Sequence, residues 1–329
     1  MTTNFTRRLG RSGIEVSPLG MGCWAIGGPF YRGATPVGWG DVGDAESRRA
    51  IQRAPDLGGT FFHTSDVYGT GHSETILGQA LHGVRERVVI ATKFGNVFDT
   101  ATRTITGEDA SPAHIRQACE ASLRRLGTDV IDLYQFHLGG YGLEKAGEVR
   151  ETLEGLARAG KIRAYGWSTD DPARAAFFAE GPHCAAVQHQ LNVFEDAPEM
   201  LALCEKAGLA SVNRGPLAMG LLTGKFRADT RLAENDVRGE KSPEWMKYFQ
   251  GGRPNPEFMR KLEAIRAVLT SGGRSLAQGA LAWLWARSPT TLPIPGFKTV
   301  RQVEENAAAI GFGPLSADQV RQIDTLLER

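Results

Sequence analysis

The sequence has few of the features that mark several large classes of protein. Its 329 residues include four widely spaced cysteines and no CxxC pair, which predicts reduced thiols, a cytoplasmic location and no zinc cluster. No apolar run approaches the roughly 18 residues of a membrane span. The 38 basic residues are balanced by 37 acidic ones, so the charge gives no reason to expect nucleic acid or an anionic membrane as a partner.

Internal repeats and low-complexity linkers are also absent, so residues 1–329 are predicted to form a single domain. No G-x-G-x-x-G follows an early strand. That absence disfavours an open doubly wound sheet, although the order of elements by itself is compatible with one. A (β/α)8 barrel, typically about 250 residues before insertions, fits within this length.

Strand-like and helix-like segments alternate along most of the chain. The expected strands are Val16–Gly20, Thr60–Ser65, Val88–Lys93, Val130–His137, Ile162–Ser168, Ala185–Leu191, Leu209–Asn213 and Thr291–Pro295. The expected helices between them are Ala45–Leu57, Ser73–Leu81, Pro112–Leu126, Leu143–Ala159, Pro172–Ala179 and Glu199–Ala207. Eight strands with helical crossovers favour an α/β fold, a closed parallel (β/α)8 TIM barrel.

Additions to this repeating pattern are predicted at both ends and after the seventh strand. Arg7–Gly13 is typical of an N-terminal hairpin. Thr223–Pro256 is polar, rich in Gly and Pro, and long, which indicates a functional loop rather than a connector. A helix pair follows it at Glu257–Leu269 and Ser275–Ala286, and an S-x-x-Q capping pattern opens an extra C-terminal helix over Ser316–Glu328.

Chemically active side chains stand at three successive strand ends. The run TFFHTSDVYG ends a strand and delivers Tyr68, VVIATKFG ends on Lys93, and VIDLYQFHLG ends on His137. Barrel enzymes place their active sites at this face, so we expect the three side chains to meet there. Any one of them alone is more typical of packing than of catalysis.

Together these residues resemble the active site of the aldo-keto reductases, whose pattern is roughly D-T-A-x-x-Y-G-x-S-E, T-K and D-L-Y-x-x-H. The resemblance implies NADPH-dependent reduction of an aldehyde or ketone to an alcohol, possible in reverse as well. A phenol with a reference pKa near 10 is a weak acid at neutrality. The resemblance therefore assigns Tyr68 as proton donor, Lys93 as the cation that stabilises its phenolate, and His137 as the group that orients the carbonyl.

One position departs from the family at a chemically active residue. His63 stands where relatives carry an aspartate that pairs with the lysine, so the resemblance makes it a fourth catalytic candidate. A neutral imidazole supplies no compensating negative charge, which disfavours a charged Lys93 in a partly desolvated site. We therefore predict a slowed reductase. Two alternatives stay open, with His63 a polar filler at the barrel rim or Asp66 a substitute anion.

Three later stretches resemble the family's nucleotide site. In YGWSTDD and AVQHQLN, the resemblance implies that Ser168, Thr169 and Gln188 contact the nicotinamide carboxamide, with Thr169 replacing the usual asparagine. NRGPLAMGLLTGKF resembles the loop over the diphosphate, and Arg214 stands where relatives stack an aromatic on the nicotinamide. In IPGFKTVRQVEEN, Lys298 at a helix N-terminus is placed for a 2′-phosphate, which favours NADPH over NADH. The remaining implied cofactor contacts are Gly215, Pro216, Leu217, Gly220, Leu222, Lys225, Gly296, Gln302, Glu305 and Asn306.

The first strand and the long loop supply the last candidates. GMGCW places Gly22, Cys23 and Trp24 on the ribose side of the nicotinamide by resemblance. Trp24, Trp245 and Tyr248 are read either as walls of the substrate pocket or as side chains that pack the loop onto the barrel. The sequence identifies neither the carbonyl compound nor the oligomeric state.

Two rival functions remain open. The first is a nucleotide-binding regulatory subunit that resembles the barrel subunits of potassium channels, its chemistry impaired by His63. The second is a metal-dependent barrel hydrolase, which lacks an H-x-H pair and a carboxylate cluster to bind the metal.

Overall fold

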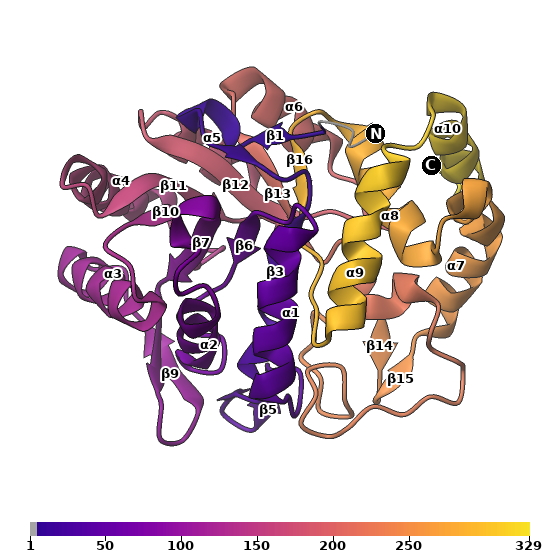
Figure 1. The fold of residues 1–329 in the computed structure, drawn as a ribbon, viewed down its shortest axis with the longest axis horizontal. Coiled ribbons are helices and arrows are strands. Elements are labelled where there is room, and N and C mark those ends of the chain that lie inside the picture. The colour runs from indigo at the N-terminus through magenta and orange to yellow at the C-terminus, as the bar shows by residue number, and fades with distance from the viewer. Residues whose placement is uncertain (1–4) are drawn as a thin grey trace.

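The computed structural model describes residues 5–329 and shows eight parallel strands curled into a barrel (Figure 1). Met1–Asn4 lie outside the described residues, and so does the N-terminal boundary of the predicted domain 1–329. The strands are β3 (Gly20–Gly22), β6 (Phe61–His63), β7 (Val89–Phe94), β10 (Ile131–Phe136), β11 (Ile162–Ser168), β12 (Cys184–Gln190), β13 (Ala210–Arg214) and β16 (Thr291–Pro293). A parallel bridge between Gly22 and Gly296 joins the first strand to the segment after the last. The predicted (β/α)8 barrel is confirmed.

Helices connect the strands and pack around the barrel (Figure 1). Six of them follow the predicted alternation. Helices α7 and α8 precede the last strand in sequence, α9 follows it, and the C-terminal helix α10 packs on α7 and α8. Their bounds are α1 Asp44–Asp56, α2 His72–Ala80, α3 Pro112–Leu126, α4 Leu143–Arg158, α5 Pro172–Ala179, α6 Pro198–Ala207, α7 Pro256–Leu269, α8 Leu276–Arg287, α9 Val300–Ala308 and α10 Ala317–Leu326.

Local sequence fixes where several helices begin. Ser111 accepts a hydrogen bond from the first turn of α3, and Pro112 occupies the first helical position, where its missing N–H costs nothing. Ser316 and Gln319 form the predicted capping box of α10. These residues explain why the sequence pattern located helix starts to within a residue or two.

The N-terminal hairpin is present, but it changes the first predicted strand. β1 (Arg7–Arg8) pairs antiparallel with β2 (Glu15–Val16), so Val16 belongs to the hairpin and the barrel strand begins only at Gly20. The prediction of one strand over Val16–Gly20 is therefore wrong, because Pro18 lies between two short strands that pair with different partners.

The sequence analysis also missed a small second sheet. β4 (Tyr31–Arg32), β5 (Thr35–Pro36), β8 (Asn96–Asp99) and β9 (Thr104–Glu108) form it in the order β5-β4-β9-β8. The long loop contains a further hairpin, β14 (Phe249–Gln250) with β15 (Arg253–Pro254). These segments follow the carboxyl ends of β3, β7 and β13, and β5, β9, β14 and β15 lie at one end of the molecule (Figure 1). They are short and polar, so no alternating pattern marks them.

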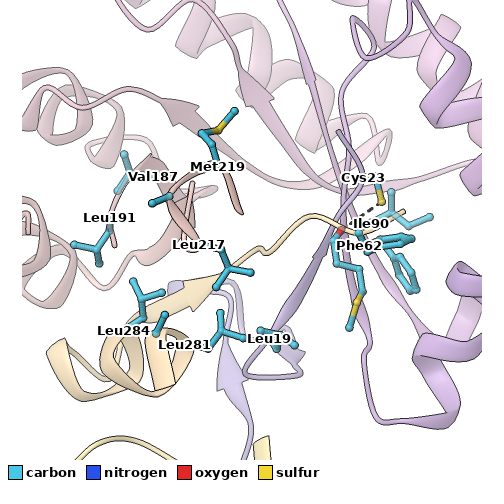
Figure 2. Close-up of a cluster of buried hydrophobic side chains, with 14 of the residues drawn as sticks. Leu19, Cys23, Phe62, Ile90, Val187, Leu191, Leu217, Met219, Leu281 and Leu284 are labelled. Carbon is cyan, nitrogen blue, oxygen red and sulfur yellow. Dashed lines mark hydrogen bonds between the residues drawn. The ribbon is translucent and has the colours of Figure 1, made fainter. Parts of the chain in front are cut away.

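The hydrophobic core has two layers, and strand alternation divides residues between them. Phe61 points into the barrel with Ala91 and Leu133. Phe62, the next residue, points outward into the layer between strands and helices, where Figure 2 shows it beside Ile90. With a period of two, His63, Lys93 and Gln135 continue the inward rows of Phe61, Ala91 and Leu133. The fold thus directs polar side chains into the mouth of an apolar barrel.

Within residues 5–329, the structure contains no helix whose length and hydropathy would let it cross a bilayer.

A buried ion pair supports the strands beneath this mouth. The Glu74 carboxylate is fully buried, accepts a hydrogen bond from Thr92, and lies 2.6 Å from Nε of Arg125. Thr92 precedes Lys93 on β7, so the pair links α2, α3 and the strand that carries the lysine.

We expect Arg125→Ala to lower the free energy of unfolding by about 3–5 kcal/mol, because it leaves the Glu74 charge buried without its partner. Urea denaturation followed by circular dichroism measures this loss. Arg124→Ala, at the exposed neighbouring position on α3, is the matched control and should change stability by less than about 0.5 kcal/mol. Equal effects of the two variants would contradict a structural role for the pair.

Candidate active site

The structure brings Tyr68, Lys93 and His137 together at the carboxyl ends of β6, β7 and β10. The Tyr68 and His137 rings meet edge to face with their centroids 6.1 Å apart. Nζ of Lys93 lies 2.8 Å from the Tyr68 hydroxyl. Lys93 is fully buried, whereas Tyr68 and His137 are partly exposed. The three residues thus form one site, with the lysine on its inner side.

Lys93 makes its contacts without a carboxylate. Its Nζ donates to the Thr64 carbonyl at 2.7 Å and to the Tyr68 hydroxyl, and in the described part of the chain no acidic side chain forms an ion pair with it. Burial lowers the pKa of Lys93 well below its usual value. An amine in this setting carries its proton less readily than an exposed lysine.

Tyr68 is held by the backbone on one side and by an aromatic ring on the other. Gly69 follows it with φ of +60°, and a Cβ at that position would come 2.0 Å from the Gly27 carbonyl oxygen, so only glycine fits. The Trp24 ring stacks on the Tyr68 ring at 5.9 Å. Burial raises the pKa of the Tyr68 phenol, while the nearby Arg214 guanidinium opposes that shift.

His63 points into the barrel, away from solvent. Its Nε2 lies 3.0 Å from the Gln135 amide nitrogen, which also approaches the Gln188 amide oxygen at 3.5 Å. Burial, and then the Lys93 and His137 charges, lower the pKa of His63 well below its usual value. His63 is therefore neutral, and its Nε2 shares a hydrogen bond with the Gln135 amide.

Ser65 links His137 to Asp66. The Ser65 hydroxyl donates to an Asp66 carboxylate oxygen at 3.2 Å and lies 3.2 Å from Nδ1 of His137. Burial, and then Glu74, raise the pKa of Asp66 to about 8. Asp66 forms no ion pair with Lys93 among residues 5–329, so the structure does not place it as the lysine's direct partner.

The implied nicotinamide contacts differ in how free their side chains are. Ser168 and Gln188 lie at neighbouring strand ends, paired in register. The Thr169 hydroxyl donates to the Gly139 carbonyl at 2.9 Å and accepts from the Asp171 N–H. Arg214 is partly exposed and bonds the Asp170 carboxylate and the Gln190 side chain. The Thr169 hydroxyl is thus used in hydrogen bonds within its own loop, whereas the Ser168 hydroxyl has no hydrogen-bond partner among residues 5–329.

Several other candidates have side chains inside the hydrophobic core. Cys23 and Leu217 are both buried and are drawn in the cluster of Figure 2, and Leu222 is fully buried. The Cys23 N–H donates to the His63 carbonyl, and the Cys23 carbonyl accepts from Ser73. The side chains of Cys23 and Leu222 are fully buried and shape the loops, so they do not face a ligand.

Positively charged side chains gather where the long loop meets the start of α9. Lys225, Arg238 and Lys298 influence one another's charge, with burial the main cause of the lowered pKa of both lysines. The Arg238 guanidinium lies 4.4 Å from the centre of the Trp39 ring, whose buried indole N–H has no partner among the described residues. Arg238 is buried and pairs with the Asp236 carboxylate. The donors that suit an anionic ligand such as a phosphate are therefore Lys225, Lys298 and the Trp39 N–H.

The start of α9 is less open than the sequence suggested. The Val300 N–H donates to the Glu46 carboxylate, and the Gln302 N–H donates to the Thr299 hydroxyl. The Lys298 ammonium donates to the carbonyls of Trp39 and Asp41. Most first-turn donors therefore already have partners, and an anion here would have to compete with the Trp39 and Asp41 carbonyls for the Lys298 ammonium.

The remaining nucleotide candidates surround this cation cluster. The Gln302 side chain accepts from the Lys298 N–H, Glu305 is partly exposed, and Asn306 is buried. Gly296 is exposed beside the Gly22 carbonyl. The other predicted positions, Gly215, Pro216 and Gly220, lie in the turn between β13 and the long loop, where Gly215 has φ of +62°.

The three aromatic candidates differ in role, since some can line the substrate pocket and one packs the long loop onto the barrel. Tyr248 is buried and accepts hydrogen bonds from Gln190 and Asn192, so it packs the loop onto the barrel. Trp245 is 55% exposed and lies 6.3 Å from Trp24, which also contacts Trp39. Trp24 and Trp245 are thus the candidates for pocket walls.

Four residues that the sequence reasoning missed belong to the site. Ser65 and Gln135 lie in the quoted strand-end motifs. Strand alternation gives the inward direction of Gln135 on β10, whereas Ser65 lies in the turn after β6. Arg238 and Trp39 carry no motif at all. Their place depends on a bridge between Trp39 and Asp236, which joins two loops almost two hundred residues apart.

Comparison with known proteins agrees with this geometry. The chain matches the family model described as Aldo/keto reductase family over residues 18–328. The protein belongs to the aldo/keto reductase family. It is 31% identical to the aldo-keto reductase YhdN of Bacillus subtilis, over 96% of this chain and 92% of that protein.

Solved structures of aldo/keto reductases extend the likeness. The glycerol dehydrogenase AKR11B4 of Gluconobacter oxydans has a TM-score of 0.82 at 31% identity, covering 98% of this chain and 95% of that one. An aldo/keto reductase of Klebsiella pneumoniae, solved in complex with NADP and acetate, has a TM-score of 0.71 at 28% identity, with the same coverage of both chains. The chain is thus an oxidoreductase of this family.

Proposed function

We propose that this protein reduces an aldehyde or ketone to an alcohol with NADPH, and that Tyr68 is the proton donor. The observation that carries the proposal is the 2.8 Å contact between the Tyr68 hydroxyl and Nζ of Lys93, beside His137 at the mouth of the barrel. The chain acts as a single domain, and its partner is a small carbonyl compound.

Each side chain has a defined task in this reaction. When bound, NADPH supplies the hydride to the carbonyl carbon. Tyr68 donates its proton to the carbonyl oxygen, and Lys93 stabilises the resulting phenolate through its hydrogen bond. His137 hydrogen-bonds the same oxygen and fixes its position.

The donor set around the long loop supports a phosphate-bearing cofactor. Lys225 is exposed and Lys298 partly exposed near the start of α9, beside the buried Arg238–Asp236 ion pair and the Trp39 N–H, which has no partner in the described part of the chain. The Klebsiella pneumoniae relative binds NADP by its printed name. The Gluconobacter oxydans relative is named a glycerol dehydrogenase, which supports a reaction that also runs from alcohol to carbonyl.

His63 limits the rate in this proposal. A neutral imidazole leaves Lys93 without a carboxylate, and burial disfavours the lysine's charge. A less charged Lys93 stabilises the Tyr68 phenolate less, so turnover slows. The same observation favours the second candidate, a nucleotide-binding regulatory subunit with little activity. Tight NADPH binding without turnover of any aldehyde or ketone would identify that alternative.

Tyr68→Phe should lower kcat for NADPH oxidation by roughly 10²–10⁴-fold, because positioned proton transfer contributes that much. The assay follows NADPH absorbance with a panel of aldehydes and ketones. Tyr141→Phe, a partly exposed tyrosine outside the site, should keep full activity. Quenching of tryptophan fluorescence by NADPH should persist in both variants. Full turnover by the Tyr68 variant would remove this residue from the reaction.

His63→Asp should raise kcat by about tenfold, equivalent to about 1.4 kcal/mol, because a carboxylate would stabilise the charge of Lys93. In His63→Asn the new side chain has nearly the same shape as aspartate but no charge, so kcat should not rise. The comparison of steady-state rates separates charge from packing. If the aspartate variant is no faster than the asparagine variant, the explanation of slow turnover is wrong.

Lys298→Ala should weaken NADPH binding roughly tenfold more than NADH binding, because only NADPH carries the 2′-phosphate. Fluorescence titrations with both nucleotides give the two dissociation constants. Lys206→Ala, an exposed lysine on α6, is the control and should change neither. Equal losses for NADPH and NADH would place the 2′-phosphate elsewhere.

A further inference from the structure

Two residues beside the active site have no task in the reaction proposed above. Ser65 and Asp66 lie in the turn between β6 and Tyr68, and both are buried. Ser65 stands where the family pattern D-T-A has alanine, so its hydroxyl is an addition to the site. This hydroxyl connects Asp66 to His137 through two hydrogen bonds of 3.2 Å each.

The connection ends on one nitrogen of His137 and leaves the other available. Nδ1 contacts the Ser65 hydroxyl. Nε2 has no hydrogen-bond partner among residues 5–329 and is not fully buried. Burial, followed by the charges of Lys93 and Arg214, lowers the pKa of His137 well below its usual value, so the ring is neutral. A neutral imidazole carries one proton, on either Nδ1 or Nε2.

The protonation state of Asp66 determines which nitrogen of the His137 ring carries the proton, because the Ser65 hydroxyl has only one proton to donate. An ionised Asp66 only accepts, so it takes the single Ser65 proton, and the Ser65 oxygen must then accept a proton from Nδ1. Nε2 is left as a bare acceptor. A protonated Asp66 donates to the Ser65 oxygen instead, and the Ser65 proton turns toward Nδ1. The ring proton is then on Nε2, which becomes a donor.

We propose that Asp66, acting through Ser65, sets which ring nitrogen of His137 holds the proton, and so decides whether His137 donates to a carbonyl oxygen or accepts from an alcohol. The inference rests on the proposed function and deepens it. Ser65 and Asp66 are positioning residues, because neither touches the reacting atoms. The donor form suits reduction, and the acceptor form suits the reverse oxidation of an alcohol.

Burial and the neighbouring charges place the change near pH 8. Burial, and then Glu74, raise the pKa of Asp66 to about 8, with Arg125 opposing the shift. Below that pH the carboxyl is protonated and His137 donates; above it His137 accepts. Other titratable groups also lie near Asp66, namely Lys93, Tyr68 and Tyr134. The titratable or charged groups near His137 are His63, Lys93, Arg214 and Arg32.

The test measures the His137 ring directly. The full-length protein with ¹⁵N-labelled histidine is titrated from pH 6 to pH 10, and the His137 signals are assigned by their loss in His137→Asn. The proton should move from Nε2 to Nδ1 in one step near pH 8. The step should disappear in Ser65→Ala and in Asp66→Asn. Ser211→Ala removes another buried serine–histidine contact, to His189, and should keep the step.

If the step came from titration of Lys93 or Tyr68, it would persist in Ser65→Ala. This variant therefore distinguishes an effect transmitted through the Ser65 hydroxyl from an effect of neighbouring charges. No step in the unmodified protein, a step that survives in Ser65→Ala, or one lost in Ser211→Ala would each overturn the proposal. The pH profile of reduction adds a second readout, because kcat/KM should fall about tenfold per pH unit above the same pH, and not in Ser65→Ala. If no carbonyl compound is reduced at all, the proposed function fails. The histidine titration still tests whether Asp66 controls the His137 tautomer through Ser65.

Discussion

The contact between Lys93 and Tyr68 is the interaction on which the proposed active site depends. A phenol transfers its proton at neutral pH only when a neighbour stabilises the phenolate, and a buried ammonium is the group best placed to do so. Burial acts against both partners, since it raises the pKa of Tyr68 and lowers that of Lys93. The site therefore relies on short contacts, with the Thr64 carbonyl holding the amine in place.

The interior of the barrel gives Lys93 no carboxylate as a direct partner among the described residues. His63, Gln135 and Gln188 form a neutral hydrogen-bonded row beneath Lys93. Such a row avoids the large cost of burying an unpaired carboxylate, but it gives up the electrostatic support that an ion pair would provide. In this chain the nearest acid along the turn, Asp66, is directed toward Ser65 and His137 instead of the lysine.

The region that suits a nucleotide is built from segments distant in sequence. The antiparallel bridge between Trp39 and Asp236 holds the loop after β3 against the long loop after β13. This contact brings Arg238 over the Trp39 ring and places both near Lys298. Asp236 forms a salt bridge with Arg238. Neither Lys225 nor Lys298 forms a salt bridge with a described acidic residue, although the charges of Asp236, Asp41 and Glu305 act on them. That imbalance is the physical basis for expecting a phosphate-bearing ligand there.

By itself, the sequence determined the barrel and the strand ends that carry Tyr68, Lys93 and His137. Alternating hydrophobic periods, capping residues and the family-like motifs are local signals, so they are readable without a structure. It could not separate Val16 from the first barrel strand, nor show the short sheet from β4 to β9, because pairing partners of two-residue strands are chosen by distant segments.

Tertiary structure alone decided what each polar group meets. It showed Cys23 and Leu222 in the core, Tyr248 as a packing residue and the first turn of α9 already hydrogen-bonded. It also revealed the Ser65 link between Asp66 and His137, since only folding sets β6 two strands from β10 in the barrel. Residue types reveal which chemistry is available, whereas hydrogen-bond partners depend on distances that no linear pattern contains.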